Sequence, residues 1–361
     1  MTSVSSPAAT VARAMRSPST GMVGASLSAV LAIAARERQP DGNCQVEGLR
    51  MTQAYSHRPV MVDEVADAFG PVPDGLFVDA TVGGGGHTAA LLDAHPGWHA
   101  LGIDRDPAAL DAARGALARF ADRVRLEQAR FDAVGELVRP DERVTAVLFD
   151  LGVSSPQLDV AERGFSYRHP GPLDMRMGPD EPLTAADVVN GYPAERLAAL
   201  FRDNGEHRFA MRIARAIVAA RPLEQTDELA DVVRSAIPAP ARRHGGHPAR
   251  RVFQAIRIEV NGELAALEAA LPVVLDLLAS GGRLAVISYH SGEDRIVKGA
   301  FATAATGGCI CPPGLPCVCG AVPAHRLVFR GARRPSAAEV GQNHRAESAR
   351  LRVIERTGAA A

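Results

Sequence analysis

A short apolar segment followed by four consecutive glycines constrains the fold of this chain more than any other feature of its sequence. The segment, residues 76–81, reads LFVDAT, and glycines occupy positions 83–86 ahead of a helical pattern that starts at His87. Glycine permits positive φ angles and lets a ligand approach the backbone closely. The first amides of a helix point toward whatever occupies the preceding turn. The pattern therefore predicts a ligand site at this turn. His87 is expected to line that site and not to bind a metal.

The same alternation of strand and helix continues along the chain. Four further apolar segments are expected to form strands, at residues 100–103, 124–127, 144–151 and 281–288. The third of these, VTAVLFDL, is apolar almost throughout, as is typical of a strand covered on both faces. Repeated strand–helix units predict an α/β fold with a parallel, doubly wound sheet, whose ligands bind at the carboxyl ends of the strands.

About 130 residues separate the last two expected strands, which is too long for a plain loop. This stretch shows helical patterns near residues 193–203, 207–220, 227–236 and 262–279. We therefore expect an inserted helical subdomain that recognises the substrate. The predicted boundaries are 156–264 for the insertion, and 51–155 with 265–361 for the sheet domain.

Residues 1–50 differ in composition from the rest of the chain. They are rich in Ala, Ser and Thr, and Met51 stands just before the first patterned segment. We expect a disordered extension, with Met51 as an alternative start. Arg13 and Arg16 precede an apolar run at 22–35, which supports a signal or transit peptide as the second interpretation. The enzyme-like pattern of the remaining chain disfavours that interpretation.

The composition is that of a soluble globular protein. Hydrophobic residues make up 47% and charged residues 22%, and no uninterrupted apolar run is long enough to predict a membrane helix. The net charge of −1 lacks the basic surplus of many nucleic-acid-binding proteins. However, residues 234–257 carry six arginines and no acid, and residues 321–361 carry eight arginines against three glutamates. These basic stretches either bind a polyanion or are solvated on separate faces.

Asp104, which follows the second expected strand, narrows the class of ligand. It lies 18 residues after Gly86, where nucleotide-binding sheets place a carboxylate against ribose hydroxyls. A dinucleotide fingerprint would need a glycine at position 88, but that residue is Thr88. Asp79, just before the glycines, is instead common in S-adenosylmethionine-dependent methyltransferases. The pattern favours S-adenosylmethionine over NAD and over a turn without a ligand.

The stretch FDLGVSSPQ at 149–157, after the fourth strand, indicates the acceptor. Methyltransferases that act on exocyclic base amines present oxygen atoms from a short polar turn with proline at this point. Because the amine lone pair is delocalised into the ring, acceptors for its hydrogens are needed to return electron density to the nitrogen. Positioning and electrostatics then suffice without a metal. Ser154 and Ser155 are the catalytic candidates, with capping or turn hydrogen bonds as the alternative.

From about residue 57 to 356, the chain resembles the bacterial 16S rRNA (cytosine-N4)-methyltransferase family, the ribosomal small subunit methyltransferase H or MraW family. The resemblance covers roughly 300 residues. It rests on collinear motifs: HRPVM (57–61), DATVGGGGHT (79–88), GIDRDP (102–107), DLGVSSPQLD (150–159), ERGFSY (162–167), PLDMRM (172–177), FAMRIARAI (209–217), FQAIRIEVN (253–261), SYHSGEDRIVK (288–298) and SARLRVIER (348–356).

The resemblance implies a class I (Rossmann-like) methyltransferase fold with S-adenosylmethionine as the methyl donor. It further implies a cytoplasmic enzyme, not bound to a membrane, that modifies N4 of a cytosine in the decoding region of 16S rRNA within the small ribosomal subunit. A non-catalytic RNA-binding assembly protein is the alternative, against which the intact glycine turn argues. Carried over by motif, the cofactor contacts fall on Gly85, Gly86, His87, Asp104, Phe131, Asp150 and Gln157.

Three residues depart from the family's usual motifs. Gly292 stands where leucine is usual in the fifth-strand motif, His344 replaces a proline, and Glu347 replaces an arginine. An acid in place of an arginine is expected to weaken a phosphate contact rather than to change the reaction.

Four of the five cysteines form two C-x-C pairs, Cys309 with Cys311 and Cys317 with Cys319. Four thiols can hold a tetrahedral zinc ion, although structural zinc sites usually space their ligands two to four residues apart. Free thiols or facultative redox pairs are the other interpretation, because lasting disulfides are not expected in a reducing cytosol. No catalytic metal is predicted.

Overall fold

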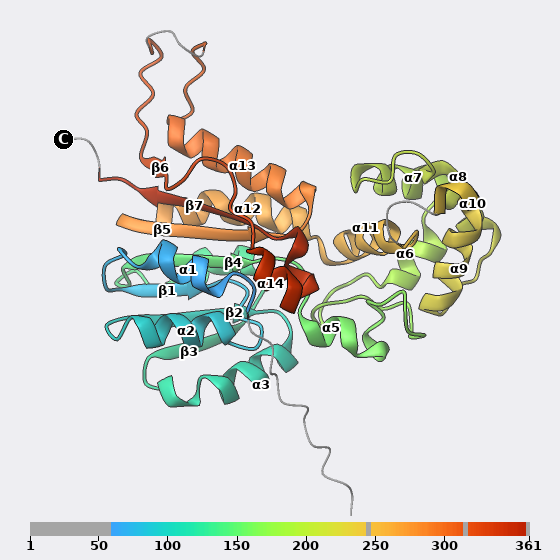
Figure 1. The fold of residues 1–361 in the computed structure, drawn as a ribbon, viewed down its shortest axis with the longest axis horizontal. Coiled ribbons are helices and arrows are strands. Elements are labelled where there is room, and N and C mark those ends of the chain that lie inside the picture. Colours follow the sequence, from blue (N-terminus) through green and yellow to red (C-terminus); the bar gives the residue numbers. More distant parts are fainter. Residues whose placement is uncertain (1–58, 243–246, 313–316, 359–361) are drawn as a thin grey trace, which may run out of the picture. The chain divides into compact units, whose positions relative to one another are not determined.

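The described residues form a central sheet of seven strands in the order β3-β2-β1-β4-β5-β7-β6 (Figure 1). Strands β1 to β5 pair in parallel, whereas β7 runs antiparallel to both of its neighbours. This is the class I (Rossmann-like) α/β fold. The strands are β1 Leu76–Asp79, β2 His99–Asp104, β3 Val124–Gln128, β4 Val144–Asp150, β5 Leu278–Ser288, β6 His325–Leu327 and β7 Arg350–Arg356.

This computed structural model describes residues 59–242, 247–312 and 317–358. The predicted extension at 1–50 and the alternative start Met51 lie outside these ranges. Across the described part of the chain, no helix has both the length and the apolar character needed to cross a membrane.

Successive residues of the strands bury their side chains on opposite faces of the sheet. In β4, Ala146 and Leu148 join one hydrophobic cluster, while Val147 and Phe149 join the other. Both faces are covered, which explains why this strand is apolar almost throughout. The first cluster includes α1 Val62–Phe69, α2 Gly86–Ala94 and α3 Pro107–Ala116; the second includes α4 Val134–Leu137, α12 Glu263–Leu277 and α13 Ser291–Thr306.

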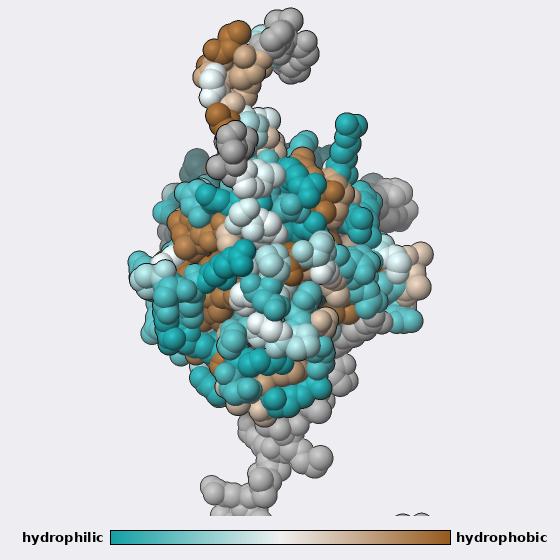
Figure 2. Space-filling model, turned by 90° about the vertical axis from the view of Figure 1, so that its left-hand side faces the viewer, coloured by the Kyte–Doolittle hydropathy of each residue, from teal (hydrophilic) through white to brown (hydrophobic). Residues whose placement is uncertain are grey.

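Between α13 and β6 the chain makes an excursion away from the sheet, seen as two extended arms in Figure 1 and as a projection in Figure 2. It carries both C-x-C pairs. After β6 the chain forms α14 Ala337–Gln342 and returns through β7. Short 3₁₀ helices occur at Ala118–Phe120, Phe131–Ala133, Ala161–Arg163 and His344–Ser348.

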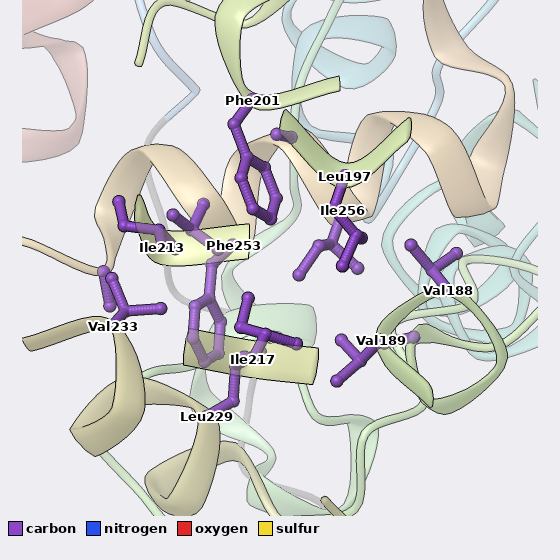
Figure 3. Packing of buried hydrophobic residues seen from close by; sticks show 14 of the residues in the cluster. Val188, Val189, Leu197, Phe201, Ile213, Ile217, Leu229, Val233, Phe253 and Ile256 are labelled. Carbon is purple, nitrogen blue, oxygen red and sulfur yellow. The ribbon is translucent and has the colours of Figure 1, made fainter. Parts of the chain in front are cut away.

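The helices between β4 and α12 bury a hydrophobic cluster of their own (Figure 3). Phe201, Ile213, Ile217 and Phe253 lie at its centre. The cluster draws on residues between Phe165 and Val260, which agrees with a helical insertion; the exact domain boundaries given above stay a prediction. The helices are α5 Ser155–Asp159, α6 Ala185–Gly191, α7 Ala194–Asp203, α8 Ala210–Ala219, α9 Thr226–Ala236, α10 Ala239–Arg242 and α11 Arg250–Asn261.

The five predicted strands pair in parallel, and the structure adds to them an antiparallel strand that was not predicted. β7 is antiparallel, and neither β7 nor α11 stands out in the sequence, because both lie in the basic stretches. In β7, Leu351 and Val353 alternate with arginines and are buried. This alternation of apolar and charged residues is the ordinary signature of a strand with one buried face.

Candidate active site

The glycine turn is held in the shape that its sequence predicts. Gly83 and Gly85 have φ angles of +50° and +81°. A Cβ atom on Gly85 would lie 3.1 Å from the side chain of Leu117, so the positive φ angle and this close approach both favour glycine here. Helix α2 begins at Gly86, and its first amides face the same turn.

Asp104 fastens this turn to the end of β2. One carboxylate oxygen accepts a 2.9 Å hydrogen bond from the Gly83 amide, and the other accepts one of 2.9 Å from the Asp106 amide. Burial raises the pKa of Asp104, although both amides oppose that change. Each oxygen keeps a lone pair, so the carboxylate can also accept hydrogen bonds from a ribose.

A buried group of polar residues lies behind the turn. The Thr88 hydroxyl donates a 2.7 Å hydrogen bond to Asp79, and burial raises the pKa of Asp79 to about 6. His87 places its Nε2 atom 3.5 Å from an Asp150 oxygen. That contact is an ion pair when His87 is protonated, and neither buried ring nitrogen makes a well-aligned hydrogen bond to the described residues. Burial alone would lower the pKa of His87, but the Asp150 and Asp79 carboxylates outweigh it and raise this pKa.

Asp150 lies at the end of β4 and connects three elements. Its amide donates to the Thr81 hydroxyl at 2.7 Å, and its second carboxylate oxygen accepts a 2.8 Å hydrogen bond from the Tyr289 hydroxyl. Burial and the Asp150 charge raise the pKa of Tyr289 well above its usual value, so this hydroxyl keeps its proton. Asp150 therefore lies between His87 and Tyr289 at the carboxyl edge of the sheet.

Gln157 is buried at the start of the insertion and connects it to the turn after β2. Its carbonyl accepts a 2.9 Å hydrogen bond from the Ser154 amide, and its amide nitrogen lies 3.4 Å from an Asp106 oxygen. Arg163 donates to the same oxygen at 2.8 Å. Asp106 thus connects Gln157 to Asp104 through hydrogen bonds.

The other predicted residues lie along the same strand edge. Phe131 follows β3, where its buried ring packs edge-on against Phe149 with centroids 5.4 Å apart. Ser154 is half-buried in the turn after β4. Ser155 is the first residue of α5, and its side chain lies outside the described part of the structure.

Sequence reasoning missed Tyr289. It follows directly on β5, as Asp150 ends β4 and Asp104 ends β2. Ligands of such sheets bind at the carboxyl ends of the strands, and this rule selects Tyr289 when it is applied to the fifth strand.

Comparison with known proteins gives the family. The model of the MraW methylase family matches residues 54–357. The chain belongs to the MraW methylase family. Two relatives named ribosomal RNA small subunit methyltransferase H come from Heliobacterium modesticaldum and Thermobifida fusca. The Heliobacterium protein is 50% identical over a match that covers 84% of this chain and 99% of the relative. The Thermobifida protein is 52% identical over a match that covers 85% of this chain and 96% of the relative.

Solved structures give only a loose match. A putative rRNA methylase from Clostridium thermocellum covers 82% of this MraW-family chain and 98% of its own, with 14% identity and a TM-score of 0.40. Membership of the MraW family makes the chain a methyltransferase that takes S-adenosylmethionine. The NAD-dependent interpretation is therefore excluded, in keeping with Thr88.

The chemistry of the site fits this cofactor. S-adenosylmethionine combines a ribose diol with a zwitterionic aminoacyl end, and when bound it supplies an electrophilic methyl group on a sulfonium. Asp104 offers carboxylate oxygens for hydroxyl donors, and the start of α2 offers backbone amides. His87 adds buried ring nitrogens that need a partner. The site thus contains both the acceptors and the donors that such a molecule requires.

Proposed function

We propose that this MraW-family enzyme methylates N4 of a cytosine in the decoding region of 16S rRNA, within the small ribosomal subunit. The names of the relatives support rRNA of the small ribosomal subunit as the substrate. The motif resemblance supports cytosine as the methylated base. The observation that carries the proposal is the position of Asp150 between His87 and Tyr289, at the edge where the glycine turn opens. The expected location is the cytoplasm, without attachment to a membrane.

In this proposal the cofactor contacts are those implied by the motifs. Asp104 accepts from the ribose, and Gly85, Gly86 and His87 surround the aminoacyl end. Phe131 provides an apolar surface, since its buried ring borders the end of β3. Asp150 supplies a carboxylate that Tyr289 keeps oriented. Gln157 contributes from the start of the insertion, held there by the Ser154 amide.

The acceptor amine needs oxygen atoms that accept its hydrogens. We assign this role to the turn after β4, with Ser154 and Ser155 as the catalytic side chains. The resulting build-up of electron density on N4 directs that atom toward the sulfonium methyl group. Catalysis then rests on orientation and on fixed dipoles.

The rRNA backbone requires a basic surface, and only part of each basic stretch can provide one. Four arginines of the first basic stretch are the candidates for phosphate contacts: Arg242, Arg243, Arg250 and Arg251. Arg243 lies outside the described residues, and the other three are exposed on the insertion, which suits phosphate contacts. Arg257 is instead largely enclosed, with 13% of its side chain exposed, and it donates two hydrogen bonds of 2.7 Å to Glu263. The first basic stretch therefore combines a structural arginine with a proposed RNA-facing set.

A small hollow beside Tyr289 offers a second place for the substrate. Arg334 and Arg350 line it, together with His290 and Glu347. Glu347 is the acid that stands where the family usually has arginine, so it lowers the positive potential of this hollow. We expect weaker phosphate binding here than in relatives with arginine.

The decisive experiment uses small subunits from a strain that lacks the corresponding methyltransferase. Incubation with the enzyme and S-adenosylmethionine is expected to yield N4-methylcytidine, detected by nucleoside mass spectrometry and mapped to the decoding region. Asp104→Ala should abolish the product, whereas Asp111→Ala, an exposed acid on α3, should retain it. Transfer to another nucleoside, or no transfer at all, would overturn the proposal.

A further inference from the structure

The excursion between α13 and β6 brings four cysteines together. Cys309 and Cys311 lie on the outgoing arm, and Cys317 and Cys319 lie on the returning arm (Figure 1). All four sulfur atoms lie within 4.8 Å of one another. This cluster is remote from the residues proposed for methyl transfer, and it does not depend on that proposal.

The spacing of the sulfur atoms matches a tetrahedron around one metal ion. Cys309 lies 3.5 Å from Cys317 and 3.6 Å from Cys319, and Cys317 lies 3.5 Å from Cys319. Zinc–thiolate bonds of about 2.3 Å set at tetrahedral angles separate the sulfur atoms by about 3.8 Å. A disulfide would need sulfur atoms about 2.05 Å apart. The observed separations are therefore close to those of a metal centre and far from those of two disulfides.

The excursion has no hydrophobic core to hold its arms in place. Among the described residues from 302 to 324, none is buried. Ile310, Val318 and Val322 are 87%, 88% and 69% exposed, and Figure 2 shows apolar side chains on the surface of the projection. A segment that buries so little apolar surface needs another source of order, and small folds commonly obtain it from disulfides or a structural metal.

Backbone amides also point at the sulfur atoms. The Val318 amide donates to Cys311 across the two arms at 3.4 Å. Such hydrogen bonds stabilise a thiolate, which is the form that binds metal. The C-x-C spacing is shorter than is usual for structural zinc sites. The fold nevertheless brings two sulfur atoms from each arm to the same place, so the four together can surround one ion.

We propose that Cys309, Cys311, Cys317 and Cys319 bind one structural Zn²⁺ ion, which fastens the two arms of the excursion. Binding replaces the thiol protons, so four thiols and one Zn²⁺ give a tetrathiolate and four released protons. The site is closed by four protein ligands, which is typical of structural rather than catalytic zinc. Soft thiolate ligands in this geometry also accept iron, which the experiment must distinguish.

The test measures metal content in untagged protein purified under reducing conditions without chelator. Elemental analysis and native mass spectrometry are expected to find about one zinc ion per chain. Cys311→Ser and Cys319→Ser should each lose most of it, whereas Cys44→Ser, which alters the cysteine outside the two C-x-C pairs, should keep it. Absence of metal with four alkylatable thiols, a mass lowered by disulfide formation, or iron in place of zinc would each overturn the proposal.

A second measurement separates loss of zinc from loss of the fold. The cysteines bury nothing in the sheet or in the insertion, so the variants are expected to keep the far-ultraviolet circular dichroism of the parent protein. Amide hydrogen exchange should rise only around residues 307–324 when Cys311 or Cys319 is replaced, or when a strong chelator removes the ion. Unchanged exchange in a zinc-free variant would show that no metal fastens the arms.

Discussion

The Tyr289 hydroxyl donates a 2.8 Å hydrogen bond to the carboxylate of Asp150, joining the ends of two neighbouring strands. The other oxygen of the same carboxylate lies 3.5 Å from His87. The partly buried Asp150 is thus shared by a neutral donor and by a histidine whose pKa its charge raises. Tyr289 is accordingly a positioning residue for Asp150.

Removing that hydroxyl should impair catalysis more than stability. Tyr289→Phe keeps the ring but leaves a charged acceptor without its donor, and hydrogen bonds to charged groups are worth about 1.5–3 kcal/mol. We expect kcat to fall roughly ten- to a hundredfold. The pKa of His87, measured by NMR, should rise further, because Asp150 then interacts with His87 alone. Tyr192→Phe, which removes a hydrogen bond to Glu259 in the insertion, is the matched control and should leave both values unchanged.

Asp79 should make the protein less stable as the pH rises. Its pKa is about 6 in the folded protein against 3.8 for the free group, so the folded state holds this proton more tightly than the unfolded state does. Stability contributed by the protonated form is therefore lost between about pH 4 and pH 6. Asp79→Asn, measured by urea unfolding, should match the parent at pH 4 and exceed it by up to about 3 kcal/mol above pH 6. An equal difference at all pH values would contradict this.

The glycine turn should not tolerate a side chain at its second positive-φ position. Gly85→Ala places a Cβ atom against Leu117 and forces a strained conformation, with a cost of about 1–3 kcal/mol. Isothermal titration should also show weaker S-adenosylmethionine binding. Gly115→Ala is the control, because a Cβ atom there meets nothing within 4 Å. Since Gly115 lies in α3, that change should stabilise the protein by about 0.5–1 kcal/mol.

Arginines of the first basic stretch should differ sharply in their effect on stability. Arg257→Ala leaves the buried carboxylate of Glu263 unpaired, which costs about 3–5 kcal/mol. Arg234→Ala breaks an exposed pair with Asp231 and should cost less than about 1 kcal/mol. Thermal unfolding of the two variants compares them directly. Similar melting temperatures would show that the Arg257 pair does not contribute as its burial predicts.

The exposed arginines should instead affect the substrate. Replacing Arg242, Arg250 and Arg251 together with alanine should raise KM for small subunits roughly tenfold at low salt and reduce the salt dependence of binding. The value of kcat should stay close to that of the parent, and the melting temperature should fall only by what the 3.5 Å ion pair between Arg251 and the buried Glu206 contributes. Unchanged methylation kinetics would mean that these side chains face solvent rather than RNA.

Much of the site could be predicted because strand ends and glycine turns are local features. Gly85 and Asp104 each follow an apolar segment, and the structure joins the glycine turn to Asp104 through a hydrogen bond from the Gly83 amide. Tyr289 and the Asp150–His87 contact depend on which strands are neighbours, and that is a property of the folded sheet. The sequence places Arg257 among the arginines of a basic stretch, because it shows the charge of this side chain but does not reveal that Glu263 is its partner.

The two faces of β7 belong to two different clusters, with Leu351 and Val353 on one and Ile354 on the other. This strand separates β5 from β6 and lies far along the chain. Translation must therefore pass residue 356 before the sheet can close. Until then β5 presents an open edge, which is the kind of surface that pairs with other chains. The sheet of this MraW-family enzyme can thus be completed only after every other strand has been synthesised.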